Sequence, residues 1–294
     1  MSKTDDIDGS AAPLIEHLIE LRNRLMWAVG SYVVAIIVVF VVAEPILTYM
    51  LHPIEQAMRA LGDPHPVMQY TAPQEYFFTL VRISMVVGLA AAFPVISYQL
   101  WRFVAPGLYK NEKSAFLPFL IASPLLFMLG AGFAHYVVTP IAMGFFLGFA
   151  DASSVVAAIL PTVTGVPAEP EAVASGIDIV FQGKVNETLD IALKLIIAFG
   201  LCFQLPVLLT LMGKAGLVTS SGLIATRKYA VVLILILAAL MTPPDIMSQL
   251  ILFAAVYPLY EVSIFLIRRI EKRREAELRA EGLWDEEDDE EAAK

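Results

Sequence analysis

Six long apolar runs constrain this chain more than any other feature of its sequence. Each run has about the length that an α-helix needs to cross a hydrocarbon core of about 30 Å, so the sequence predicts an all-α, polytopic membrane protein with six transmembrane helices. A content of 58% hydrophobic and 17% charged residues agrees, because soluble domains are about half apolar and about a quarter charged. The predicted spans are residues 25–43, 77–98, 116–138, 189–212, 229–241 and 246–267.

The fifth run is unusually short. Its 13 residues would extend only about 20 Å as a helix, which is less than the thickness of an average bilayer. We expect the fifth and sixth helices to be short and to form a hairpin around Met241–Asp245 that stops short of one membrane face or thins the bilayer locally.

The distribution of lysine and arginine predicts the orientation. If both termini share one side, that side receives 16 of the 20 cationic residues. The opposite loops hold Arg59 and Lys184, whereas Arg82 and Lys194 lie near span ends, from which they can snorkel. Both termini are therefore predicted to be cytoplasmic by the positive-inside rule.

Three segments fall outside the predicted six-helix domain, residues 14–270, or interrupt it. Residues 1–13 are predicted to be a disordered tail, and they lack the basic and apolar regions of a cleavable signal peptide. Residues 150–176, in the second outer loop, are rich in Ala, Val and Pro and are expected to be mobile in part. Residues 271–294 form a charged tail, whose acids account for most of the net charge of −9.

Signatures of catalysis and metal binding are missing from the sequence. The four histidines are scattered, and Cys202 is the only cysteine, so a metal site is improbable. Neither a phosphate-binding loop nor a nucleophile elbow is present. We therefore predict a protein without enzymatic activity, cofactor or nucleic-acid partner, and we assign the serines within the spans to helix packing.

A charged amphipathic segment precedes the first span. Its leucines recur at helical spacing, while Glu16, Glu20 and Arg24 share one polar side. The pattern predicts a helix at the membrane surface that leads into the span. Glu20 could simply pair with Arg24 at i, i+4, or it could offer a carboxylate to a partner. Likewise, Glu112 could be an ordinary loop acid or part of a binding site.

Two polar residues lie within apolar spans, where they are energetically costly and usually face a bundle interior or a partner. Gln204 lies in mid-span beside Pro206, and its amide could be satisfied by a neighbouring helix or by a partner helix. Glu261 lies about 24 Å beyond Asp245, near the predicted cytoplasmic surface. An ion pair with an arginine such as Arg268 is at least as plausible as a functional role.

Four ordered motifs resemble the TatC family of twin-arginine protein translocase subunits over roughly residues 14–270. They are His17–Leu25 (HLIELRNRL), Phe93–Trp101 (FPVISYQLW), Phe103–Glu112 (FVAPGLYKNE) and Thr242–Gln249 (TPPDIMSQ). The resemblance implies a bacterial cytoplasmic-membrane receptor that binds Arg-Arg signal peptides of folded proteins and draws on the proton-motive force. It also implies self-association and recruitment of single-span TatB-like and TatA-like partners around the short fifth helix and the fourth.

The same resemblance implies roles for particular residues. In the family the signal peptide is bound by two glutamates, which correspond to Glu20 and Glu112. Arg22, Phe103 and Pro53 fall on motif positions tied to function, and Asp245 and Gln249 match the outer tip of the fifth and sixth helices. The family often has a glutamate where this chain has Gln204, and an amide cannot carry a proton.

A small-solute secondary transporter is the alternative function that the sequence allows. The chain shows no inverted repeat with paired broken helices around a midplane site, and polar groups at mid-depth are few. Solute uptake by the purified protein alone in liposomes would favour this alternative.

Overall fold

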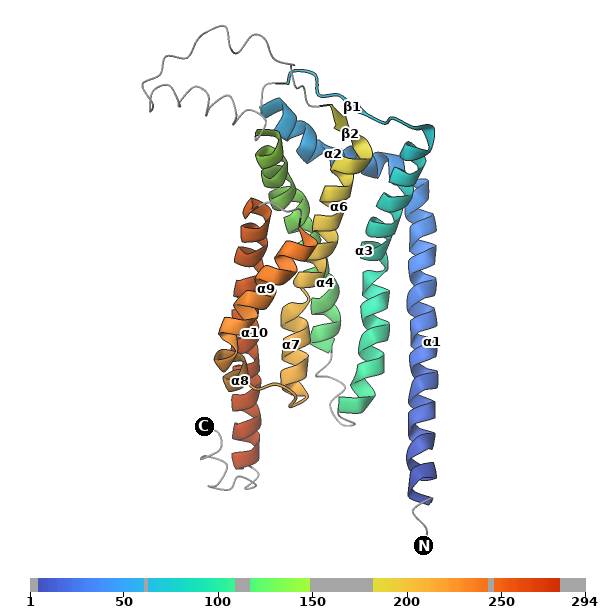
Figure 1. Cartoon of the computed structure of the whole chain (residues 1–294). Helices are drawn as coiled ribbons and strands as arrows, with labels where there is room; N and C mark the ends of the chain where they lie inside the picture. The colour runs from blue at the N-terminus through green and yellow to red at the C-terminus, as the bar shows by residue number, and fades with distance from the viewer. Residues whose placement is uncertain (1–4, 61–62, 109–116, 149–181, 243–245, 281–294) are drawn as a thin grey trace, which may run out of the picture.

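The computed structural model describes residues 5–60, 63–108, 117–148, 182–242 and 246–280 as an elongated helical bundle (Figure 1). Two short strands, β1 (Met68–Gln69) and β2 (Gly183–Lys184), pair in parallel at one end, which we call the sheet end. Both described termini lie at the other end, the terminal end (Figure 1). The α-helices include α1 (Asp5–Val41), α2 (Ala43–Ala60), α3 (Pro73–Leu108), α4 (Leu117–Phe133), α6 (Val185–Cys202), α7 (Leu205–Lys214), α8 (Ser220–Ala225), α9 (Arg227–Met241) and α10 (Ile246–Ala280). A π-helix, η2 (Ala134–Val138), directly follows α4.

Five stretches in the described residues are long and apolar enough to cross a membrane. They are Ile15–Val41, Pro73–Phe103, Pro118–Gly148, Val185–Lys214 and Ser248–Glu277. Each contains one of the predicted spans, apart from a few end residues. The remaining predicted span corresponds to α9, whose 15 residues extend about 22 Å, so the predicted brevity of the fifth helix is confirmed. The all-α, polytopic fold class is therefore confirmed.

The two terminal helices are longer than predicted. α10 has 35 residues, so the prediction that the sixth helix is short is wrong: acidic and basic residues spaced at helical intervals carry the helix beyond the apolar run. α1 begins at Asp5, inside the segment predicted to be a disordered tail. Extending a helix that is already formed costs little, and Ala11 and Ala12 have the highest helix propensity.

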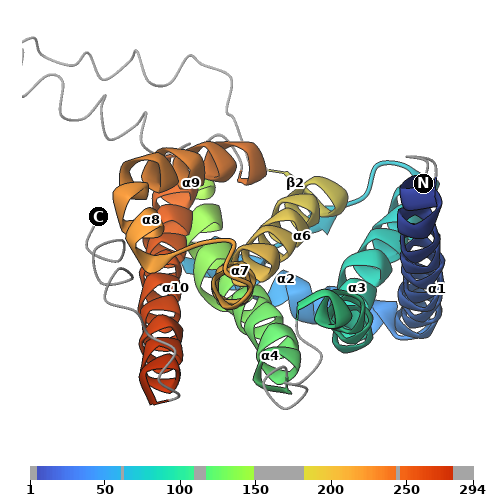
Figure 2. The ribbon, with the colours of Figure 1, turned by 90° about the horizontal axis from the view of Figure 1, so that it is seen from below.

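α1 is a single uninterrupted helix (Figure 1). The prediction that residues 17–25 lie along the membrane surface before the first span is therefore wrong, because the amphipathic segment continues the axis of the span. α1 packs mainly on α3, at one side of the bundle (Figure 2). Most of its apolar side chains are consequently exposed on the outside of the bundle.

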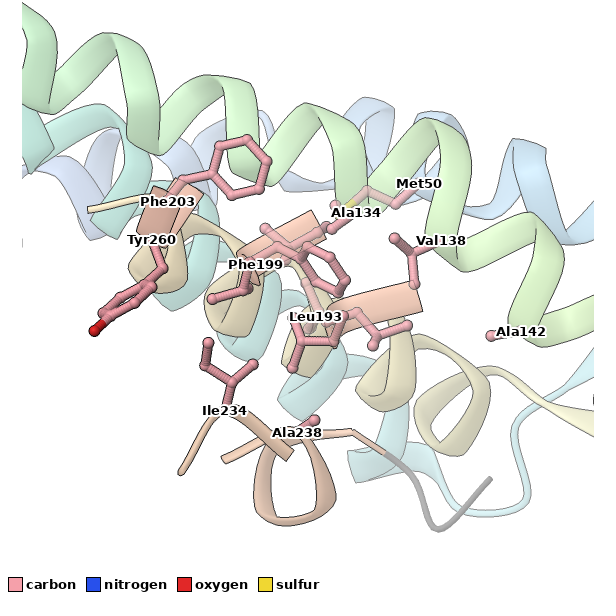
Figure 3. Close-up of a cluster of buried hydrophobic side chains, with 14 of the residues drawn as sticks. Met50, Ala134, Val138, Ala142, Leu193, Phe199, Phe203, Ile234, Ala238 and Tyr260 are labelled. Carbon is pink, nitrogen blue, oxygen red and sulfur yellow. The ribbon is translucent and has the colours of Figure 1, made fainter. Parts of the chain in front are cut away.

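α6 lies at the centre of the main hydrophobic core. Phe199 and Leu195 are fully buried, and side chains from α2, η2, α9 and α10 gather around this helix (Figure 3). α4 and α6 approach closely because Gly130 has no side chain: a Cβ there would lie 2.5 Å from the carbonyl oxygen of Phe199. A glycine at this contact lets the two backbones meet directly.

The fourth predicted span is interrupted. α6 ends at Cys202 and α7 begins at Leu205, with Pro206 in the first turn of α7. Because proline has no N–H, it cannot donate to the carbonyl four residues earlier, and the first turn of a helix is where it is best tolerated. The interruption places Gln204 at the junction of the two helices.

Candidate functional site

The candidate site is a shallow groove on α1 at the terminal end. It has a volume of about 360 Å³ and is lined by Glu16, Ile19, Glu20, Asn23, Arg24 and Trp27. Counted from Glu16, these residues lie at i, i+3, i+4, i+7, i+8 and i+11, so a single helix presents them on one face. The groove combines two carboxylates with the exposed apolar side chains of Ile19 and Trp27.

Glu20 is held in place by Arg24. The Arg24 Nη2 atom donates to Glu20 Oε1 over 3.1 Å, as the sequence spacing predicted, and the Glu20 side chain keeps 34% of its surface exposed. Arg24 Nη1 also donates to Gln99 Oε1 on α3 over 3.4 Å. The arginine therefore connects two helices and orients the carboxylate, which retains free acceptor positions for a ligand.

A ring contact joins α1 to α3 beside the same groove. His17 stacks on Phe103, with ring centroids 4.4 Å apart and an angle of 18° between the ring planes. Phe103 is thus brought against α1 at His17, which lies three residues, or about one helical turn, before Glu20. The last turns of α3 are held against α1 by two contacts: the ring stack and the hydrogen bond from Arg24 to Gln99.

Arg22, which was also predicted to bind the signal peptide, does not line the groove. Arg22 is exposed but lies two residues from Glu20, and residues so spaced point to different sides of a helix. Glu112 lies outside the described residues, as does Asp245. The predicted insertion at 150–176 also lies outside them.

Gln204 makes a two-point contact with α4. Its Oε1 accepts from Ser123 Oγ over 2.7 Å, and its Nε2 donates to the Ser123 carbonyl over 2.8 Å. Ser123 is buried. The sequence allowed the Gln204 amide to bond either to a neighbouring helix of the same chain or to a partner helix. This geometry agrees with the first explanation, in which the amide has its hydrogen bonds within the chain.

Replacing Gln204 by leucine is expected to lower the stability of the chain by about 1–2 kcal/mol, because the Ser123 groups lose their partner in an apolar setting. Unfolding of the purified protein in detergent measures this change. In the Gln204→Leu background, Ser123→Ala should lower the stability little further, since the hydrogen-bonded pair is already broken. Fully additive losses would show that the two residues act independently.

Glu261 on α10 links this helix to α9. Arg227 Nη2, at the start of α9, donates to Glu261 Oε2 over 2.6 Å, and Tyr257 Oη donates to Oε1 over 3.0 Å. The suggested pairing with Arg268 is therefore wrong. Arg268 is seven residues along the same helix, whereas the chain reversal brings Arg227 directly opposite Glu261.

The remaining polar and motif positions also have structural contacts. Gln249 Nε2 donates to the Leu235 carbonyl over 3.2 Å, which ties α10 to α9. Pro53 is buried within α2 at the sheet end. In the part of the chain that the structure describes, no group of three His, Cys, Asp or Glu side chains could hold a metal ion.

His17 and Gln99 were not predicted from the sequence as site residues, although they lie in the motifs His17–Leu25 and Phe93–Trp101. The available signal was weak: Gln99 is a polar residue at the end of an apolar span, where a cation on a neighbouring helix could use it. Which helix would supply that cation depends on the packing of α1 against α3, and no local pattern encodes it.

The fold and the charged groove define a polytopic helical membrane protein with an ionisable site on its N-terminal helix. Comparison with known proteins assigns the family. Residues 16–254 match the model of the family described as Sec-independent protein translocase protein (TatC). The chain therefore belongs to the TatC family, and it is a component of a protein translocase.

Individual relatives agree with this assignment. The chain is 42% identical to the Sec-independent protein translocase protein TatC of Magnetococcus marinus, over 93% of this chain and 90% of the relative. It is 35% identical to that of Aquifex aeolicus, over 86% of this chain and 94% of the relative. A crystal structure of a twin-arginine translocase receptor, TatC, matches with a TM-score of 0.66 and 34% identity, covering 86% of this chain and 98% of the other.

Proposed function

We propose that this chain is the receptor and assembly core of a twin-arginine translocase. It binds the Arg-Arg signal peptides of folded proteins and recruits single-span partners for export driven by the proton-motive force. The observation that carries the proposal is the Glu20 carboxylate: it is one-third exposed, oriented by Arg24, and set in a groove that α3 braces from the side. The similarity of the chain to a crystal structure of a twin-arginine translocase receptor supports the proposal.

The chemistry of the groove suits a guanidinium ligand. Arginine is always charged and presents a planar fork of donors that matches the two oxygens of a carboxylate. Lysine supplies the charge without the fork, so a carboxylate site that accepts a bidentate pair favours arginine. In this proposal Glu20 binds one arginine and Glu112 the other, because Glu112 follows the end of α3 by four residues and the last turns of α3 pack against α1.

The apolar part of the groove suits the rest of a signal peptide. Ile19 and Trp27 are exposed by 46% and 71%, on the same face as the carboxylates. An apolar residue that follows the arginine pair can bury surface against them, at about 25 cal/mol for each Å² of apolar area removed from water.

The partner surface in this proposal is centred on α9. This helix is too short for an average bilayer, and Val232, Leu233, Ile236 and Leu240 are exposed along it. A thinned bilayer at this position favours association with another helix. Gln204 has its amide satisfied within the chain, so we expect Gln204→Leu to leave co-purification of the partners intact.

The orientation in this proposal places the terminal end in the cytoplasm and the chain in the bacterial inner membrane. Cations gather at that end, on α1, at the start of α9 and along the last turns of α10, whereas the sheet end carries Arg59 and Lys184. The positive-inside rule favours the cation-rich side as cytoplasmic.

An export assay tests the function. A strain that lacks its own TatC is complemented with this chain, in the presence of matching partner subunits, and is given a folded reporter with an Arg-Arg signal or its Lys-Lys twin. We expect export of the first reporter and at least tenfold less of the second. Equal export of both, or of neither while the chain is present in the membrane with its partners, would contradict the proposal.

A further inference from the structure

The last turns of α10 carry a cationic stripe that the proposed function does not use. Arg268, Arg269, Lys272 and Arg273 line one open groove of about 440 Å³, together with Phe265 and Ala276. Residues at these spacings share one face of a helix. All four cations are exposed, and none has an ion pair within the described residues.

The stripe faces away from the bundle. The buried side chains of α10, among them Tyr260, Ile264 and Ile267, lie on the opposite side of the helix. Glu271 also lies off the stripe, and it accepts a hydrogen bond from the Ser220 amide over 2.8 Å. The groove is therefore open to the surroundings of the protein, without a carboxylate among the residues that line it.

The position of the stripe along α10 agrees with the far edge of a hydrocarbon core of ordinary thickness. On the same outward side, Val262 and Phe265 precede most of the stripe and are exposed by 47% and 64%. Arg268 lies 22 residues after the start of α10 at Ile246, or about 33 Å along the axis, close to the thickness of a hydrocarbon core. From Arg268 to Arg273 the helix rises about another 7 Å, which matches the headgroup layer.

We propose that this stripe binds the phosphate headgroup of an anionic phospholipid, whose acyl chain lies against Phe265 and Val262. Clusters of Lys and Arg directly beyond a transmembrane helix attract anionic lipids, with each residue contributing about a fivefold gain in affinity. A cationic signal peptide does not fit, because it would meet four like charges. An acidic protein segment would satisfy the cations but would not use the exposed apolar residues above them.

Native mass spectrometry of the full-length chain in a neutral detergent tests the proposal. The protein is titrated with phosphatidylglycerol and with phosphatidylcholine of the same acyl chains. We expect the first lipid to bind at least tenfold more tightly. Arg269→Gln with Lys272→Gln should weaken phosphatidylglycerol binding by roughly 25-fold and leave phosphatidylcholine unchanged, while Arg269→Lys alone should retain it.

The control removes two charges elsewhere: Arg59→Gln at the sheet end and Arg274→Gln on another side of α10. This variant should bind phosphatidylglycerol as the wild type does, and both variants should elute as the wild type on size exclusion. Equal affinity for the two lipids, or an equal loss in the control, would overturn the proposal. So would displacement of the lipid by millimolar inorganic phosphate, or a lipid preference that emerges only when residues 281–294 are removed.

Discussion

Replacing Glu20 by alanine is expected to weaken binding of an Arg-Arg signal peptide by about 10- to 100-fold. The reason is the loss of a charge-assisted contact between carboxylate and guanidinium, which contributes about 1.5–3 kcal/mol. Removal of Glu112 as well, by Glu112→Gln, should abolish specific binding. Crosslinking of a labelled signal peptide to the purified chain in detergent measures both effects.

Glu55 provides a matched control for this prediction. It pairs with Arg59 over 2.8 Å at i, i+4, as Glu20 pairs with Arg24, but it lies on α2 at the sheet end. Exposed pairs of this kind contribute only a few tenths of a kcal/mol to stability, so neither substitution should unfold the chain. Glu55→Ala should leave crosslinking unchanged. Undiminished crosslinking after loss of both Glu20 and Glu112 would remove these residues from the site.

Gly130→Ala is expected to produce the largest loss of stability, about 3 kcal/mol. The added Cβ would lie 2.5 Å from the Phe199 oxygen and 2.9 Å from a ring carbon of Phe203, and backbone atoms cannot move aside as a flexible side chain can. α4 and α6 would have to separate, and overpacking of this kind costs about 1–3 kcal/mol, with rigid neighbours at the upper end. Thermal unfolding in detergent measures the change.

Gly132 is the control, two residues along the same helix. A Cβ at Gly132 meets nothing within 4 Å. Gly132→Ala should therefore be neutral or slightly stabilising, because alanine has a higher helix propensity than glycine. If the two substitutions have equal effects, the close approach of α4 and α6 is not the reason for glycine at 130.

The features predicted correctly from sequence are those set by local composition. Apolar runs determine where helices cross a bilayer, because every backbone polar group in lipid must be satisfied within the helix. The brevity of α9 follows in the same way from its run of 13 apolar residues. The pair between Glu20 and Arg24 was predictable because both partners lie on one helix, one turn apart.

Most of the features that were missed or predicted wrongly depend on how distant segments pack. The partner of Glu261 was sought on its own helix, but the antiparallel packing of α9 and α10 brings Arg227 opposite it. α10 continues beyond its apolar run because a charged helix needs no lipid to persist, so hydropathy alone underestimates its length. The contacts of His17 with Phe103 and of Gln99 with Arg24 form only when α3 packs against α1.

A double-mutant cycle between Glu20 and the arginine pair tests the central claim most directly. The affinities of wild-type chain and Glu20→Gln are measured for a signal peptide with Arg-Arg and for one with Lys-Lys. Replacing Arg-Arg by Lys-Lys in the peptide lowers its affinity by some factor. If Glu20 contacts an arginine, this factor should be at least tenfold smaller for Glu20→Gln than for the wild type. Fully additive losses would show that Glu20 does not contact the pair, and the proposed role of this groove would be wrong.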